Sequence, residues 1–303
     1  MSWQVANRIA SVAAAQAHGE LGVDPTDTPI QVSPAIDSAG LRLMWQELDG
    51  LSGLYLAGRE GGGVLVSEKL TRAARRHTAA HELGHHRLRH PTTADPDGDI
   101  GDPLGLPPDQ HRRLPNERAA EAFAAWFLMP HRGVRAVMTS LGLTDFSSAM
   151  QVYQLSLHLG TAYMATIRQL TLLRLISQTT ARSWSAIVPG TFKRALAGDL
   201  LESTRDADVW HLERGAERVL YTSPGDLLIL PQRHRVRDIT GPAEAAGHIR
   251  GNTAVRCGVP EDGRPGTAVI QASGVDITVV VEPHPHGLYL GSTSSPISIG
   301  LSS

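Results

Sequence analysis

The sequence predicts an α+β protein: a mainly helical N-terminal part with a small sheet, followed by a β-rich, sandwich-like C-terminal domain. Apolar residues recur with helical spacing in several segments up to residue 176, and three short apolar runs between them suit strands. After residue 183 the sequence pattern changes to short runs of β-favouring residues separated by Gly and Pro. We therefore divide the chain into residues 1–130, 131–182 and 183–303.

Composition excludes several classes of protein. The net charge of −2 argues against a protein held on nucleic acid or membrane mainly by bulk charge. Cys257 is the only cysteine, so no disulfide can form within one chain. No apolar run reaches membrane-spanning length, and the N-terminal segment has the apolar spacing of a helix face rather than of a signal peptide. We expect a cytoplasmic protein without a membrane partner.

The first elements are an amphipathic helix and a small sheet. The helix spans residues 3–18 and ends near Gly19, and a Pro-punctuated connector over 23–34 follows it. Short apolar runs separated by Gly clusters then predict three strands, at 41–48, 52–58 and 62–67.

Two stronger helices come next, separated by a segment rich in breakers. Residues 70–90 have no Pro and one Gly, which predicts a helix. Residues 91–115 contain six prolines and three glycines, so we expect a long surface loop with no regular element. Residues 116–129 predict a helix that ends at Pro130, with Asn116 as its N-cap.

The remaining chain is predicted as a helical region and a β-domain. Helices are expected at 131–140, 146–158 and 161–176, and the last two, joined near Gly160, have the rhythm of a helix-turn-helix. A short helix near 191–203 is followed by the runs DVWHL, RVLYT, DLLIL, TAVRC, TAVIQA and DITVVVE, which suggest a sandwich or barrel.

The stretch HTAAHELGHHRLRH, residues 77–90, has the spacing of a metal site. On a helix His81 and His85 lie on one face, about 5–6 Å apart at Cβ, so each can offer one nitrogen to a single zinc ion. Glu82 lies about 100° further round the helix, where it can reach a water molecule on the metal and act as a general base. The alternative is a solvated helix that happens to be rich in histidine.

The second helix offers a complementary pair of acids. A zinc site that does chemistry needs three protein ligands and one open position, and Glu117 supplies the third ligand. Glu121, one turn later, is placed to accept a hydrogen bond from the other nitrogen of a histidine ligand. The simpler alternative is that both acids favour a helix start and an exposed face.

Other residues near the motif have less defined roles. Gly84 costs a helix roughly 1 kcal/mol relative to Ala, so we expect a close neighbour there, such as a strand packed under the site. His77 shares a face with His81 and could be a ligand, but Glu117 would then be redundant. We therefore assign His77, together with His86 and His90, to surface or core polar roles. His111 and His158 are weak candidates for stabilising an oxyanion in the transition state. The HPH run at 284–286 is a weak candidate for a second metal site, and an exposed turn is the alternative.

The order of these motifs resembles the ImmA/IrrE family of zinc metallopeptidases. The family's marks are an AHELGH helix and a later E-x-x-A-[DEN]-x-F-A-A-x-[LF]-L-M-P helix, and the chain has AHELGH at 80–85 and ERAAEAFAAWFLMP at 117–130. The resemblance covers roughly residues 1–176. It implies a zincin-like core with His81, His85 and Glu117 as Zn²⁺ ligands, Glu82 as catalytic base and Glu121 behind a ligand histidine. The chain departs from the family pattern at His77 and Ala79, where bulky apolar residues are usual, and in its long gap between the motifs.

The resemblance also implies a function. Members of the family cleave or otherwise inactivate helix-turn-helix repressors, so we expect an intracellular zinc-dependent endopeptidase that derepresses a mobile element or stress response. The alternative is a DNA-binding or partner-binding stress regulator with a structural or vestigial zinc site. Residues 161–173 would then read DNA, but Arg168 and Arg174 are the only nearby cations, so we favour a helical hairpin that completes the protease fold.

Overall fold

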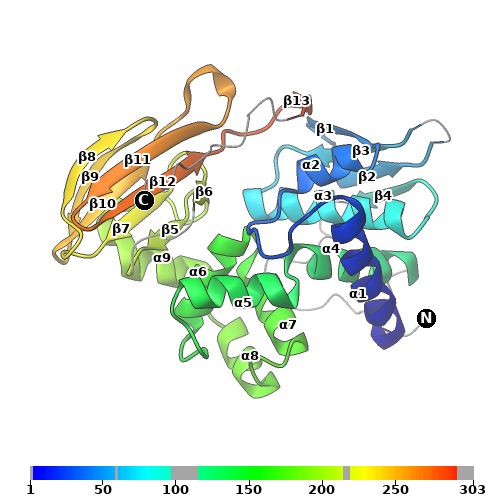
Figure 1. Ribbon diagram of the computed structural model, residues 1–303, viewed down its shortest axis with the longest axis horizontal. Helices are drawn as coiled ribbons and strands as arrows, with labels where there is room; N and C mark the ends of the chain where they lie inside the picture. The colour runs from blue at the N-terminus through cyan, green and yellow to red at the C-terminus, as the bar shows by residue number, and fades with distance from the viewer. Residues whose placement is uncertain (1–2, 59–60, 97–114, 214–218, 292–303) are drawn as a thin grey trace, which may run out of the picture.

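A mixed sheet over a layer of helices, with two further sheets beside them, makes up the molecule (Figure 1). The computed structural model describes residues 3–58, 61–96, 115–213 and 219–291. The predicted α+β class is confirmed, with helices and a sheet in the N-terminal part and a β-rich C-terminal part.

The N-terminal sheet has the strand order β13-β1-β3-β2-β4, in which β13 (Gly287–Leu288) comes from the far end of the chain. Its strands β1 (Arg42–Gln46), β2 (Leu51–Leu56) and β3 (Gly63–Ser67) are the three predicted ones. Strand β4 (Thr93–Pro96) pairs antiparallel with β2 at the edge of the sheet. The expectation that residues 91–115 hold no regular element is therefore wrong at its start. A proline is tolerated at an edge strand because the free side of the strand needs no hydrogen-bond donor. The predicted loop over 97–114 lies outside the described residues.

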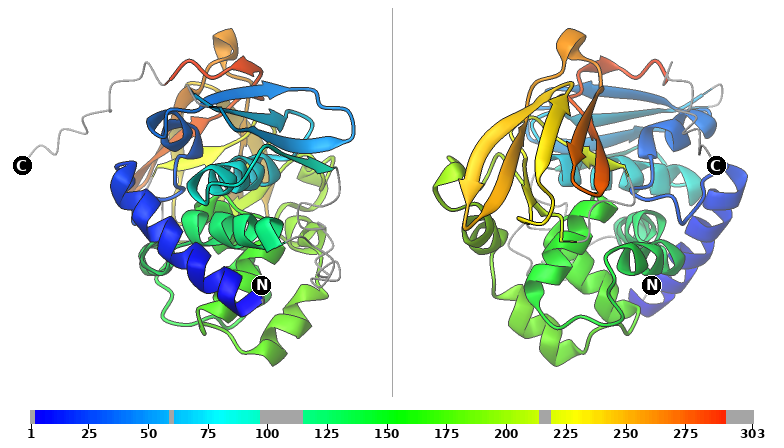
Figure 2. Two further views of the ribbon diagram at one scale, coloured as in Figure 1. Left: turned by 90° about the vertical axis from the view of Figure 1, so that its right-hand side faces the viewer. Right: turned by 60° about the vertical axis from the view of Figure 1, so that its left-hand side comes forward.

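Four helices accompany this sheet: α1 (Trp3–Glu20), α2 (Val32–Ser38), α3 (Arg72–Arg87) and α4 (Pro115–Leu128). Helix α2 was not expected, because the connector around it is punctuated by Pro. Helix α4 begins at Pro115, so Asn116 lies in the first turn instead of at the predicted cap. In Figure 1, α3 lies directly under the sheet and α4 under α3, and Figure 2 shows α1 running beside them.

Five helices follow: α5 (His131–Ser140), α6 (Ala149–Leu159), α7 (Tyr163–Leu172), α8 (Gln178–Ser185) and α9 (Pro189–Ala197). Helices α6 and α7 are the predicted hairpin. Gly160 ends α6 with φ of 63°, a conformation that favours glycine. None of the helices in the described ranges has both the length and the apolar character that a bilayer span requires.

The C-terminal region contains two four-stranded sheets, ordered β5-β7-β10-β9 and β6-β12-β11-β8. Their strands are β5 (Val209–His211), β6 (Leu220–Thr222), β7 (Leu227–Leu230), β8 (Val236–Thr240), β9 (Ala243–Ile249), β10 (Asn252–Cys257), β11 (Gly266–Ala272) and β12 (Val275–Val281). All four residues of β7 are buried, because one face of its sheet packs on the other sheet and the opposite face packs near α9. The predicted sandwich-like arrangement is found (Figure 2).

Helix α6 holds the sandwich through side-chain hydrogen bonds to strand β5 and the residue before it. The Gln154 side chain donates to the carbonyl oxygen of Val209 at 2.9 Å and accepts from the amide of His211 at 2.8 Å. Tyr153 donates from its hydroxyl to Asp208 at 3.1 Å. The Gln154 side chain therefore hydrogen-bonds the backbone of β5 through both a donor and an acceptor. The helices and the sandwich also share one apolar cluster.

The chain then returns to the N-terminal sheet. Strand β13 (Gly287–Leu288) pairs antiparallel with β1. Just before it, Glu282 accepts from the Arg72 guanidinium at 2.8 Å, and His286 lies 2.6 Å from a Glu68 oxygen. The HPH run thus contacts Glu68. The domain boundary at residue 183 stays a prediction, but residues 282–289 are part of the N-terminal sheet and its border.

We expect Glu282→Gln to destabilise the fold by about 1–3 kcal/mol at pH 7, since it removes a charge-assisted hydrogen bond to Arg72. Burial alone would raise the pKa of Glu282, but Arg72 and Arg76 hold it below the ordinary value of 4.5. The stabilisation is therefore complete above pH 4.5 and is lost as pH falls through the depressed pKa. Urea unfolding should show the difference between the two proteins shrinking below pH 4.5. Glu47→Gln, at an exposed ion pair with Lys69, is the control and should cost about 0.5 kcal/mol or less. Equal costs at pH 7 would contradict the argument.

Candidate metal centre

Helices α3 and α4 lie unusually close together at Gly84. A Cβ atom at this position would meet the ring of Phe123 on α4 at 3.0 Å, so any larger residue would require Phe123 or the helix to shift. The close neighbour expected from the sequence is present, but it is helix α4 and not a strand. The approach brings the histidines of α3 opposite the first turn of α4.

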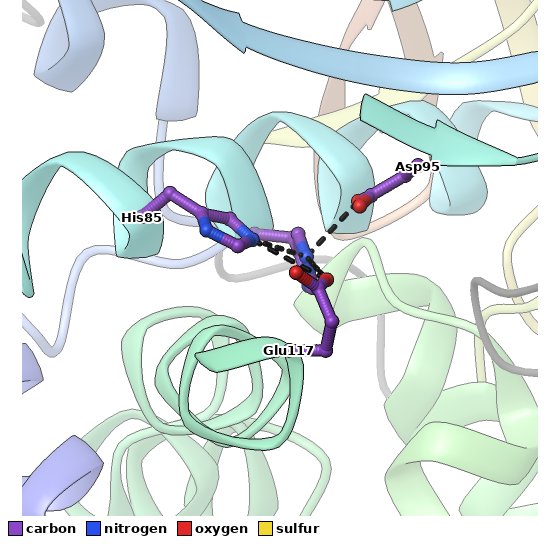
Figure 3. Close-up of side chains that lie close together, drawn as sticks. His85, Asp95 and Glu117 are labelled. Carbon is purple, nitrogen blue, oxygen red and sulfur yellow. Dashed lines mark hydrogen bonds and ion pairs between the residues drawn. The ribbon is translucent and has the colours of Figure 1, made fainter. Parts of the chain in front are cut away.

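Four side chains meet between these helices and strand β4. His81 and His85 are both buried, and their Nε2 atoms lie 2.9 Å apart. Glu117 Oε2 lies 3.3 Å from Nε2 of His81 and 3.5 Å from Nε2 of His85. Asp95, which is 4% exposed, places Oδ2 at 3.0 Å from Nε2 of His81. Figure 3 shows Asp95, His85 and Glu117 pointing toward one another from different elements.

The spacing of these atoms fits a single zinc ion. Ligands about 2.0–2.1 Å from a tetrahedral ion are about 3.3 Å from one another. The four measured separations run from 2.9 to 3.5 Å, and one ligand atom from each of the four residues lies within 4.8 Å of all the others. Two imidazoles with carboxylates are also donors that zinc accepts. The residues present therefore fit this metal.

The cluster concentrates negative charge around His81. Burial alone would lower the pKa of His81, but the carboxylates of Asp95, Glu117 and Glu121 raise it well above its ordinary value. Burial alone would raise the pKa of Glu117, but hydrogen bonds with the two histidines lower it far below its ordinary value. The cluster thus stabilises positive charge between the imidazoles and the acids, as a cation site requires.

The second nitrogens of the two histidines face different partners. Glu121 Oε2 lies 3.8 Å from Nδ1 of His81, which is nearby but too long for a hydrogen bond, and 3.0 Å from Nε2 of His77. The hydroxyl of Thr93 lies 3.2 Å from Nδ1 of His85. His77 thus has the polar role expected from the sequence, as the partner of Glu121.

Glu82 lies in a buried space between α3 and the sheet. It is 0% exposed, and neither carboxylate oxygen has a hydrogen-bond partner within the described ranges. A Cβ atom on Gly53 of strand β2 would lie 2.3 Å from Oε1 of Glu82, so the missing side chain of Gly53 makes the room for this carboxylate. Burial raises the pKa of Glu82 well above its ordinary value, and the nearby Asp95 raises it further, although His81 opposes this.

Sequence reasoning missed Asp95 and Thr93, because both lie in the segment expected to be a loop. Only the pairing of β4 with β2 brings them to the histidines. Of the weaker candidates, His111 lies outside the described residues. His158 packs edge-on against Trp210, with ring centroids 5.2 Å apart, which is a packing role in the sandwich interface. His86 pairs with the Tyr55 hydroxyl at 3.2 Å.

A comparison of the sequence with models of protein families identifies the family of the N-terminal part. Residues 39–159 match the model of the IrrE N-terminal-like domain, Peptidase M78. The resemblance to the ImmA/IrrE family is confirmed. The matched segment runs from just before β1 to the end of α6 and includes both sequence motifs. A comparison with curated proteins gave no match. The cluster of His81, His85, Asp95 and Glu117 therefore lies within a metallopeptidase-like domain and could hold a metal ion.

Gly53→Ala should destabilise the fold by about 1–3 kcal/mol, because its methyl group would overlap the Glu82 carboxylate and lie 2.5 Å from Cγ2 of Thr78. In a Glu82→Ala background the substitution should cost less, since the nearest atom is gone. A double-mutant cycle by urea unfolding measures this coupling. Gly63→Ala on β3, where the nearest atom would be 3.7 Å away, is the control. A cost of Gly53→Ala that is the same with and without Glu82 would contradict the placement of the carboxylate.

Proposed function

We propose that the protein is a zinc-dependent endopeptidase with His81, His85 and Glu117 as metal ligands and Glu82 as the general base. The observation that carries the proposal is the position of Glu82. A buried carboxylate whose oxygens accept no hydrogen bond in the described part of the chain is costly. Here it lies beside the Asp95 carboxylate and next to ligand atoms spaced for one ion. Such a group is useful where it receives a proton from water.

The residues would act as follows. When bound, zinc supplies Lewis-acid activation of a water molecule and of the peptide carbonyl. Glu82 takes the proton from the attacking water and passes it to the leaving amine. Its raised pKa makes the carboxylate a stronger base, which suits a group that takes a proton from water. Thr93, 3.2 Å from Nδ1 of His85, would keep that imidazole oriented.

The proposed substrate is a helix-turn-helix repressor whose cleavage switches on a mobile element or a stress response. The support for this is the family relationship. Co-expression with a candidate repressor, followed by mass spectrometry of fragments, tests it. Fragments that appear with the native chain and not with Glu82→Gln identify both the substrate and the cleaved bond. An intact repressor in both cases would count against this substrate class.

The second candidate is a DNA-binding or partner-binding regulator with a structural or vestigial zinc site. One observation favours it: Asp95 adds a fourth ligand-type group, and four protein ligands are typical of structural zinc. Helix α7 argues against direct DNA reading, since six of its ten residues are buried, among them the polar Thr166 and Gln169, which leaves few side chains for a DNA groove. A salt-dependent DNA shift without proteolysis would favour the regulator.

The purified protein should contain about one zinc ion per chain. His81→Ala removes the imidazole that lies close to both acids of the cluster, so zinc should be lost on dialysis against a chelator. Elemental analysis of the dialysed proteins measures this. His248→Ala, which removes an exposed histidine of strand β9, should keep its zinc. Undiminished zinc in His81→Ala would show that the ligand set is wrong.

Glu82→Gln should keep zinc and the fold but reduce cleavage by at least about 10²-fold, because an amide cannot accept the proton from water. Glu47→Gln makes the same chemical change at an exposed position and should keep full activity. Initial rates on the repressor, together with zinc content and a thermal melt, provide the comparison. Full turnover by Glu82→Gln would rule out the general-base role.

A further inference from the structure

We propose that Asp95 is a fourth protein ligand that closes the metal site in the resting protein, so that strand β4 must shift before water can bind. The inference rests on the proposed function of His81, His85 and Glu117 as a metal centre. It adds an inhibitory element, carried by the edge strand, to the three ligands and the base that the sequence motifs supply.

The backbone directs Asp95 into the site. Strand β4 pairs antiparallel with β2, and Asp95 stands opposite Gly53 in the register. Directly opposed residues of a sheet project from the same face, and the space above Gly53 is the one that Glu82 occupies. Asp95 therefore points toward α3, where it is 4% exposed.

The contact of Asp95 is with the nitrogen that would bind the metal. Nδ1 of His81 faces Glu121 at 3.8 Å, so Nε2 is the nitrogen directed at the cluster. Oδ2 of Asp95 lies 3.0 Å from this Nε2, and the Asp95 carboxylate also lies beside that of Glu82. Once an ion lies on Nε2, an oxygen at this distance is at the separation of a neighbouring ligand on the same ion.

A fourth protein ligand changes what the site can do. Three protein ligands leave one position of a tetrahedral zinc ion for water, whereas four leave none. With Asp95 in place Glu82 has no water to deprotonate, although it lies next to the site. With Asp95 in place, the site should bind the metal ion tightly but hydrolyse peptide bonds slowly.

Strand β4 is a short edge strand of the sheet. It has four residues and a single neighbouring strand, and its pairing with β2 is irregular between Leu51 and Gly53. Strands β1 and β3 each have neighbours on both sides. A shift of β4 would withdraw Asp95, and Thr93 with it, from the histidines. The three ligands themselves stand on α3 and α4, which pack on each other and not on β4 alone.

Cobalt substitution tests the coordination directly. The full chain, Asp95→Ala and the control Glu47→Ala are loaded with Co²⁺, and their visible spectra are recorded with and without azide. The native spectrum should not change on addition of azide, because four protein ligands fill the ion. The Asp95→Ala spectrum should change, because one position is open, and transfer of Co²⁺ to a chelator should be at least about tenfold faster than in the native protein.

Two results would overturn the inference. Native protein that responds to azide as Asp95→Ala does would show an open position beside Asp95. Spectra and release rates that are identical for native protein and Asp95→Ala would show that Asp95 does not touch the ion. Glu47→Ala must behave like the native protein, so that loss of one negative charge is not itself the cause.

A hydrolysis assay separates this inference from the proposed function. Asp95→Ala should cleave the repressor at least about tenfold faster than the native chain, and Glu82→Gln in that background should abolish the gain. A closed cobalt site in native protein without cleavage by any variant would refute the peptidase and leave the Asp95 ligand standing. A cobalt-loaded Asp95→Ala protein that cleaves more slowly than the native chain would refute the inhibitory role.

Discussion

The packing of helix α3 between strand β2 and helix α4 is the constraint on which the metal centre depends. Glycine occupies both contact surfaces: Gly84 on α3 itself faces Phe123, and Gly53 on β2 faces Glu82. Each absent side chain is replaced by a group from the neighbouring element. His81, Glu82 and His85 of α3 thereby become buried, an environment in which they are stable only with a charge partner or a metal ion.

This burial explains why the cluster combines histidines with acidic residues. Two imidazoles alone would be neutral in such a place, because burial disfavours their protonated form. Asp95, Glu117 and Glu121 reverse that preference at His81 and so create a site for positive charge. The binding free energy of a cation there adds to the stability of the folded chain, since the unfolded chain does not hold these groups together.

Local sequence patterns predicted the parts of the site that depend on helix geometry. The four-residue spacing of His81 and His85, and the position of Glu117 in the first turn of a helix, follow from periodicity. Asp95 could not be found this way, because its place depends on a register with Gly53, 42 residues earlier, in a stretch where Pro and Gly suggest a loop. The pairing of β13 with β1 is hidden for the same reason, since two residues of strand leave no periodic signal.

For the same reason, the sequence predicted the β-domain but not how this domain is attached to the rest of the protein. Alternating apolar runs predicted a sandwich, but not that the segment after it would reach the start of α3. Arg72, Arg75 and Arg76 stand in the first turns of that helix, where the helix dipole disfavours cations. Glu282 pairs with Arg72, and Arg75 donates to His284 at 2.8 Å. The helix that carries the histidines is thus held at its N-terminus by the chain that leaves the sandwich, so that the position of α3 relative to β2 and α4 depends on both halves of the protein.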